Sequence, residues 1–200
     1  MKKYLMITII LISFIAGCSI YKTIINVSRL KYKLDSVTKF KLNGIAIDSK
    51  SKLSDFGPGD MLKLTSVFST GKFPVTFDLN ILAKNPNDGT GGYDQTDITI
   101  KSFSWDLYLN KKKIVSGNID KVVTVPGIGN SSIIPLIVKL DLIEFLDNGS
   151  FNEVIDLALK LGGKNKTTSE IEVIAKPVLG TPFGDLSYPE PVKIVDYQYN

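Results

Sequence analysis

An alternating segment over residues 74–85, PVTFDLNILAKN, restricts the fold of this chain more than any other feature. Apolar and polar residues follow each other with a period of two, which places each set on its own face of a β-strand. The apolar set is Val75, Phe77, Leu79, Ile81 and Ala83, with Leu82 as an exception on the polar face. Pro86 lacks the backbone donor that a strand ladder needs, so we expect the strand to end just before it.

A second alternating segment, residues 101–110, predicts another half-buried strand. Its apolar face consists of Phe103, Trp105, Leu107 and Leu109. Just upstream, Ile98 and Ile100 have the opposite parity, so the faces change over at Lys101-Ser102. An extra residue in one strand has this effect, which predicts a β-bulge or a change of strand at this point.

Further short apolar segments are separated by Gly, Pro and Asn. The strands that we expect from them cover residues 38–47, 61–68, 131–140, 170–179 and 190–199, with one or two more within 112–125. Many short strands with such turn residues are typical of antiparallel sandwiches. The sequence therefore predicts a mainly β protein, an antiparallel β-sandwich of the fibronectin type III or immunoglobulin kind.

One helical insertion is expected at residues 141–161. Ser150 and Glu153 have the spacing of a capping box, in which each side chain binds the other residue's backbone N–H. An apolar stripe follows, formed by Phe151, Val154, Ile155, Ala158 and Leu159, and Gly162-Gly163 provides a stop. A shorter turn is expected before it, at 141–147. We expect the stripe to close one end of the sandwich core; the alternative is that it binds a partner.

The N-terminus carries the chain's one cysteine. Lys2 and Lys3 precede an apolar run that ends in small residues, so residues 1–17 have the parts of a secretory signal. The sequence Ile15-Ala16-Gly17-Cys18 resembles the lipobox of bacterial lipoproteins. That resemblance implies cleavage between Gly17 and Cys18, a diacylglycerol on the Cys18 thiol, and attachment to the bilayer through the acylated residue.

The alternative is an uncleaved helical anchor. The apolar stretch continues past the cysteine to Ile25, and about 20 residues can span a bilayer. Lys22 would then lie inside the span, at a cost of up to about 3 kcal/mol. Ser19 stands where lipoproteins retained at the inner membrane often have an aspartate. We therefore expect an anchor in the outer membrane, with the outer leaflet of the plasma membrane as the alternative.

Residues 18–37 are expected to form a tether between the anchor and a domain at 38–200. The tether carries Lys22, Arg29, Lys31 and Lys33 before its first acid. Beside anionic lipid each basic residue could add about 1 kcal/mol of attraction. The equally weighted alternative is a short helix or strand that leads into the domain.

Three features occur together within residues 38–199: Asn85-Pro86-Asn87 after an alternating strand, the order of the following strands and helix, and TPFGDLSYP at 181–189. With these features, that part of the chain resembles the late-embryogenesis-abundant group 2 proteins, the water stress and hypersensitive response (WHy) domain. The resemblance implies a β-sandwich with one helix, an association with desiccation tolerance, and no established enzymatic activity. The loop at 87–97 is longer than is usual after the motif.

Two groups of polar residues are candidate sites. In Asn85-Pro86-Asn87, we expect the amides to bind nearby backbone while Pro86 fixes the turn; presentation of the amides to a ligand is the alternative. Asp88, Asp94 and Asp97 lie in a Gly-rich loop of the kind that can hold calcium, but their spacing fits no known calcium loop. We therefore predict no metal site.

Composition bears on the class of function. The chain has no histidine, which removes the commonest general base and any imidazole metal ligand. Its net charge of +4 would fall to +2 without Lys2 and Lys3, too little to indicate nucleic-acid binding. We expect a non-catalytic envelope protein without a cofactor, with a protective or interacting role at the membrane. The alternative is a ligand-binding or assembly subunit of an envelope complex, with an unidentified protein partner.

Overall fold

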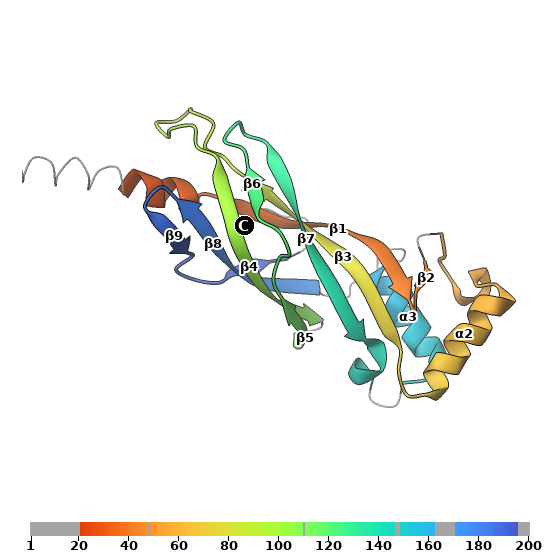
Figure 1. The fold of residues 1–200 in the computed structure, drawn as a ribbon. Coiled ribbons are helices and arrows are strands. Elements are labelled where there is room, and N and C mark those ends of the chain that lie inside the picture. Colours follow the sequence, from red (N-terminus) through yellow and green to blue (C-terminus); the bar gives the residue numbers. More distant parts are fainter. Residues whose placement is uncertain (1–20, 48, 110, 147–148, 163–170, 196–200) are drawn as a thin grey trace, which may run out of the picture.

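The computed structural model describes residues 21–47, 49–109, 111–146, 149–162 and 171–195. Within them, two antiparallel sheets pack face to face (Figure 1). The first sheet contains β1 (Lys31–Leu42), β2 (Ile45–Ala46), β3 (Pro74–Lys84) and β7 (Ser131–Asp141). The second contains β4 (Ile98–Leu109), β5 (Lys112–Gly117), β6 (Val123–Val125), β8 (Ile171–Thr181), β9 (Gly184–Ser187) and β10 (Val192–Ile194). The prediction of an antiparallel β-sandwich is confirmed.

The strand order is β2-β1-β3-β7 in the first sheet and β10-β8-β4-β5 in the second. In the second sheet β6 also pairs with β4, and β9 pairs with β8. One or two strands were expected within 112–125, and the structure has two there, β5 and β6. Of the strand expected at 190–199, β10 occupies three residues, and residues 196–200 lie outside the described chain.

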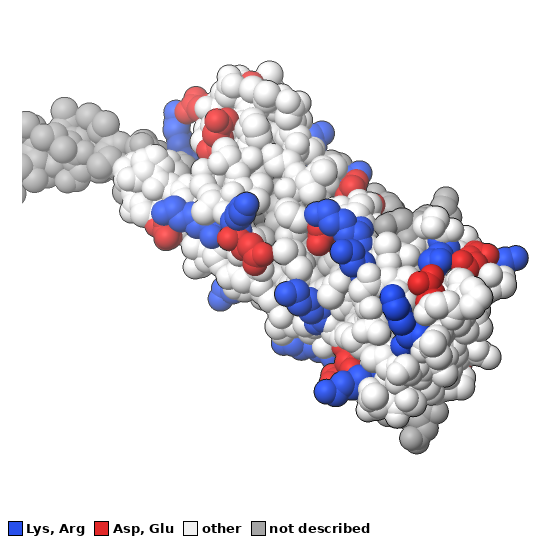
Figure 2. Space-filling view, turned by 45° about the vertical axis from the view of Figure 1, so that its right-hand side comes forward, with Lys and Arg blue, Asp and Glu red and all other residues white. Residues whose placement is uncertain are grey.

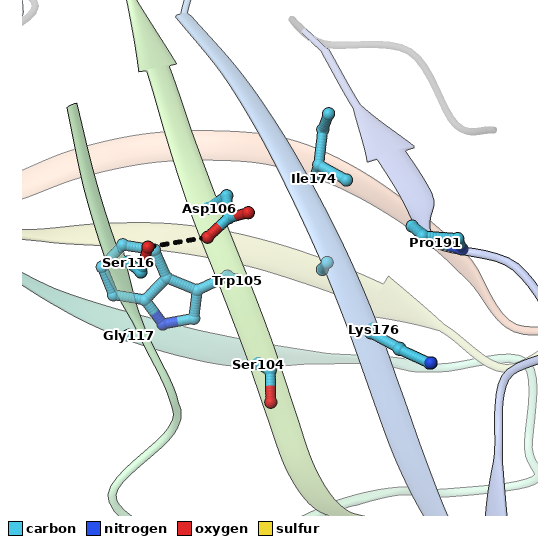
Figure 3. A pocket seen from close by; sticks show the side chains of 9 residues that line it. Ser104, Trp105, Asp106, Ser116, Gly117, Ile174, Lys176 and Pro191 are labelled. Atoms are coloured by element: carbon cyan, nitrogen blue, oxygen red, sulfur yellow. Dashed lines mark hydrogen bonds between the residues drawn. The ribbon is translucent and has the colours of Figure 1, made fainter. Parts of the chain in front are cut away.

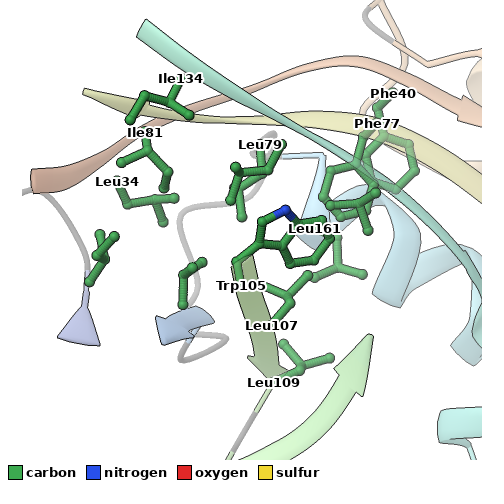
Figure 4. Packing of buried hydrophobic residues seen from close by; sticks show 14 of the residues in the cluster. Leu34, Phe40, Phe77, Leu79, Ile81, Trp105, Leu107, Leu109, Ile134 and Leu161 are labelled. Atoms are coloured by element: carbon green, nitrogen blue, oxygen red, sulfur yellow. The ribbon is translucent and has the colours of Figure 1, made fainter. Parts of the chain in front are cut away.

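The core lies between the sheets, and the strands with alternating sequences supply it. From β3 the predicted apolar face is buried, while Leu82 is half-buried on the other face. From β4, Trp105, Leu107 and Leu109 lie opposite the side chains of β3 and β7 (Figure 4). Burial of apolar surface of this kind is the main favourable term in folding.

The expected irregularity in β4 is present. The pairing of β4 with β8 shifts register between Ile100 and Ser102, and this extra residue turns the apolar side chains on either side of it toward the same core. Ile100 and Phe103 are both fully buried, whereas Lys101 between them is exposed. The change of parity in the sequence is therefore a β-bulge.

Four of the helices lie together at one end of the sandwich (Figure 1). They are the 3-10 helices η1 (Leu53–Asp55) and η2 (Leu142–Phe145) and the α-helices α2 (Pro58–Ser69) and α3 (Phe151–Leu161). The Ser150–Glu153 capping box forms as predicted. The stripe of α3 packs on the core, where the Phe151 ring makes edge contacts with Phe68 and Phe73. The helix therefore closes this end of the core.

The strand predicted at 61–68 is wrong, because these residues lie in α2. Pro58 stands at the first helical position, where its missing N–H has no cost. Leu64 is fully buried, and Met61 and Phe68 are partly buried on the same side. This spacing of three and four residues is that of a helix, and a period of two does not describe it.

The boundary predicted between a tether at 18–37 and a domain from 38 is also wrong. β1 begins at Lys31, and the helix at 21–28 packs on the sandwich before it. Tyr32 and Leu34 belong to the core. The folded part of the chain therefore begins no later than residue 21. Two alternatives were given for the basic segment at 18–37, a free tether or a short helix or strand that leads into the domain. The structure shows the second alternative, with a helix at 21–28 followed by β1.

Candidate functional site

The predicted cleavage and lipid-attachment residues, Gly17 and Cys18, lie outside the described residues, the first of which is Tyr21. The helix at 21–28 lies at the opposite end of the sandwich from α2 and α3 (Figure 1). Val27 is buried, and its carbonyl accepts a hydrogen bond of 3.1 Å from the Tyr188 hydroxyl. None of the helices in the described ranges is both long enough and apolar enough to cross a bilayer.

The Asn85-Pro86-Asn87 motif lies at this same end, where β3 leaves its sheet. The side chain of Asn85 is fully buried, and its amide nitrogen donates to the carbonyls of Thr96 (2.8 Å) and Val125 (2.9 Å). Its oxygen accepts from the backbone and side-chain nitrogens of Asn87 at 3.1 and 2.9 Å. One amide therefore joins the end of β3, the loop before β4 and the end of β6.

Asn87 extends this network to the N-terminal helix. It is fully buried, and its amide nitrogen donates to the carbonyl of Asn26 at 2.7 Å. Its oxygen accepts from the Arg29 guanidinium at 2.9 Å. The Asn26 amide in turn donates to the Thr96 hydroxyl at 3.1 Å. The amides of Asn85 and Asn87 thus have their partners inside the protein, and a ligand would reach them only if these bonds broke.

The long loop at 87–97 packs on the N-terminal helix through a charged pair and a ring. The Arg29 guanidinium carbon lies 3.4 Å from the centre of the Tyr93 ring, within the range of cation–π contacts. Lys22 and Asp94 form an exposed ion pair at 3.8 Å. Lys22 and Arg29, two of the basic residues in the predicted tether, therefore contact this loop.

The three loop acids do not converge on one point. Asp88 accepts from the Thr90 backbone and hydroxyl, and these bonds hold the pKa of Asp88 below its usual range. Asp94 pairs with Lys22, and Asp97 accepts from the backbone of Gly127 at 2.7 Å. Among the described residues no three His, Cys, Asp or Glu side chains are grouped as metal ligands would be.

A shallow pocket of ≈ 290 Å³ lies on the second sheet (Figure 3). It contains Asp106, which accepts from the Ser116 hydroxyl at 2.7 Å and pairs with Lys113 at 2.8 Å. The bonds from Lys113 and Ser116 lower the pKa of Asp106. Since the carboxyl stays ionised at neutral pH and binds a lysine, it is a weak general base for the serine.

Fold and contacts together define this protein as an antiparallel β-sandwich with a helix-capped end and an end closed by buried asparagines. No family model matches the sequence, and no curated protein matches it either. Among solved structures, a protein from Archaeoglobus fulgidus shares 15% identity, with a TM-score of 0.30 over 83% of this chain and 99% of that one. A target of the Northeast Structural Genomics Consortium shares 11%, with a TM-score of 0.35 over 84% and 86%. At scores this low, neither structure bears on function.

Proposed function

We propose that this protein is a non-catalytic lipoprotein of a bacterial cell envelope, held at the bilayer through acylated Cys18. The observation that carries the proposal is the chain's single cysteine in the lipobox sequence Ile15-Ala16-Gly17-Cys18. Folded structure is present by residue 21, so an anchor at Cys18 would hold the sandwich close to the lipid. Two or three acyl chains on one residue suffice for stable anchoring.

The test is membrane fractionation of the Cys18→Ser variant beside the natural chain. The natural chain is expected in the membrane fraction, because a diacylated residue rarely leaves a bilayer. The variant is expected to lose that anchor. If the natural chain itself stays in the membrane fraction with an uncut leader and no lipid, the uncleaved helical anchor is correct instead.

We further propose that the sandwich is a WHy-type domain with a protective role under water or osmotic stress. The order of elements supports this: the Asn-Pro-Asn turn follows β3, the β4–β5 hairpin and β7 come next, and α3 precedes β8. Deletion of the gene should lower survival on drying, and the natural chain should restore it. Equal survival with and without the gene would contradict the protective role.

The non-catalytic part of the proposal rests on the absence of histidine from all 200 residues and on the bonding of Asp106. In the pocket, the Ser116 hydroxyl donates to the Asp106 carboxylate, and Lys113 neutralises that carboxylate. Turnover of an ester, glycoside or peptide by the purified chain, lost in Ser116→Ala, would overturn the proposal.

A second candidate function is an assembly subunit of an envelope complex. It is favoured by an apolar strip on β7, an edge strand, where Ile133, Pro135 and Ile137 are all exposed. Edge strands that expose apolar side chains are common sites of association. Crosslinking in the intact envelope should capture a partner that Ile137→Lys no longer captures. Identical capture by both chains would count against this surface.

A further inference from the structure

Exposed aromatic and aliphatic side chains gather at the end of the sandwich where the described chain begins. Tyr21 and Ile24 lie on the N-terminal helix with 67% and 45% of their surface exposed. Tyr93 lies in the loop at 87–97, and Phe183, 55% exposed, lies in the turn between β8 and β9. We call these four residues the N-terminal face.

Strand pairing places these segments at one end. Thr99 pairs with Gly180, so the loop that precedes β4 and the turn that follows β8 leave the sheet together. Asn26 binds Thr96, which places the helix beside that loop. Figure 1 shows the helix, the loop and the β8–β9 turn at the end away from α2 and α3. In the view of Figure 2, blue and red atoms lie close together around a white area at this end.

We propose that the N-terminal face lies in the headgroup region of a bilayer and points α2 and α3 away from the membrane. This inference rests on the proposed membrane attachment through the N-terminus. Cys18 precedes Tyr21 by three residues, which span about 10 Å even when fully extended. A lipid on Cys18 would therefore hold this face within reach of the headgroups, which are several ångströms deep.

The side chains suit that environment. Tyrosine is enriched at membrane interfaces because its ring is apolar and its hydroxyl is polar. Phenylalanine and isoleucine gain by leaving water. The nearby carboxylates carry partners, since Asp94 pairs with Lys22 and Asp185 pairs with Lys101. The face therefore presents little net charge, and its contact with lipid should depend weakly on salt.

Side-chain contacts attach the N-terminal helix, the loop at 87–97 and the β8–β9 turn to the sandwich or to one another. Arg29 stacks on Tyr93 and donates to Asn87, so the helix and the loop share one support. Pro182 and a bond from the Phe183 backbone to the Thr181 hydroxyl hold the β8–β9 turn. A face attached to the sandwich in this way would limit how far the domain can tilt on its anchor.

The experiment places one new cysteine in the full chain, as Phe183→Cys on the face and Leu62→Cys on α2 as the matched control. Leu62 is 74% exposed at the opposite end. An acylated Cys18 does not react, so a thiol-directed environment-sensitive dye reports only the new site. Each chain is placed in vesicles of phosphatidylethanolamine and phosphatidylglycerol that contain lipids spin-labelled at the headgroup.

The F183C dye should show blue-shifted emission and severalfold stronger quenching than the L62C dye, at low and high salt alike. A dye at Ile24→Cys should show the same blue shift and quenching as the F183C dye. Agreement between the two sites would exclude an effect confined to the β8–β9 turn. Equal quenching at both ends would overturn the proposed orientation. Intact mass spectrometry of the same samples tests the anchor separately. An unmodified Cys18 would refute the proposed lipid attachment, whereas the quenching tests whether the N-terminal face contacts the headgroups.

Discussion

The side-chain amide of Asn87 donates to the backbone carbonyl of Asn26 at 2.7 Å, across 61 positions of sequence. Both residues are buried, so this bond attaches the N-terminal helix to the turn that ends β3. The same side chain accepts from Arg29, which stacks on Tyr93. A turn motif thus serves as the attachment point for the N-terminal helix.

Asn87→Ala should lower the free energy of unfolding by about 1–3 kcal/mol, because the Asn26 carbonyl and the Asn85 oxygen each lose one buried donor and the Arg29 guanidinium loses its acceptor. Gln95→Ala, at an exposed position in the same loop, is the control and should change stability by less than about 0.5 kcal/mol. Urea unfolding measures both. Unchanged stability in N87A would favour the alternative in which the amide serves a ligand.

Gly117→Ala should destabilise the sandwich by about 1–3 kcal/mol, because a Cβ at this position would overlap the Trp105 ring. Gly59, in α2, has open space within 4 Å of the point where a Cβ would stand. Its substitution by alanine should therefore stabilise the chain by about 0.4–1 kcal/mol. Thermal unfolding compares the two variants. Shifts of the same sign in both would contradict the packing described for Trp105.

Ser150→Ala should cost about 1 kcal/mol, because the Ser150 hydroxyl caps the first turn of α3. Ser150→Asp restores an acceptor at the cap and should recover most of the loss. Chemical unfolding of the three chains measures the difference. Equal stability of S150A and the natural chain would mean that the cap contributes nothing to the helical end.

Acid should weaken the fold partly through Asp106. Lys113 and Ser116 lower the pKa of Asp106 in the folded chain, so the carboxylate favours folding above its ordinary value of 3.8. That contribution is lost as the pH falls through the lower, folded value. Because the pair is partly exposed, it is worth at most about 1 kcal/mol. Between neutral pH and the acid range, the Asp106→Asn variant should therefore lose less stability than the natural chain. Urea unfolding at each pH measures this loss. Equal losses in the two chains would contradict the proposed role of Asp106.

Local sequence signals were sufficient for much of the fold. The change of parity between Ile100 and Phe103 located a bulge, and the Ser150–Glu153 spacing located a helix start, since each feature is encoded within a few residues. The helix at 61–68 was missed because Lys63 and Thr65 alternate with Leu62 and Leu64, as polar and apolar residues do in a strand. Gly57-Pro58 just before it was the available signal of a helix start.

The asparagine network could not be predicted in the same way. Asn87 and Thr96 form hydrogen bonds with Asn26 from 61 and 70 positions away in the sequence. The residues around Asn26 and Arg29 carry no pattern that indicates such distant partners. The basic residues therefore suggested a free tether, whereas packing brings them into the domain. The gathering of Tyr21 and Phe183 at one end likewise depends on strand pairing.

The most direct test of membrane attachment is intact mass spectrometry of the protein purified from its own membranes. We predict a chain that begins at Cys18 and carries the added mass of a diacylglycerol, with or without a further acyl group. A chain that retains residues 1–17 and an unmodified thiol would contradict the proposed attachment.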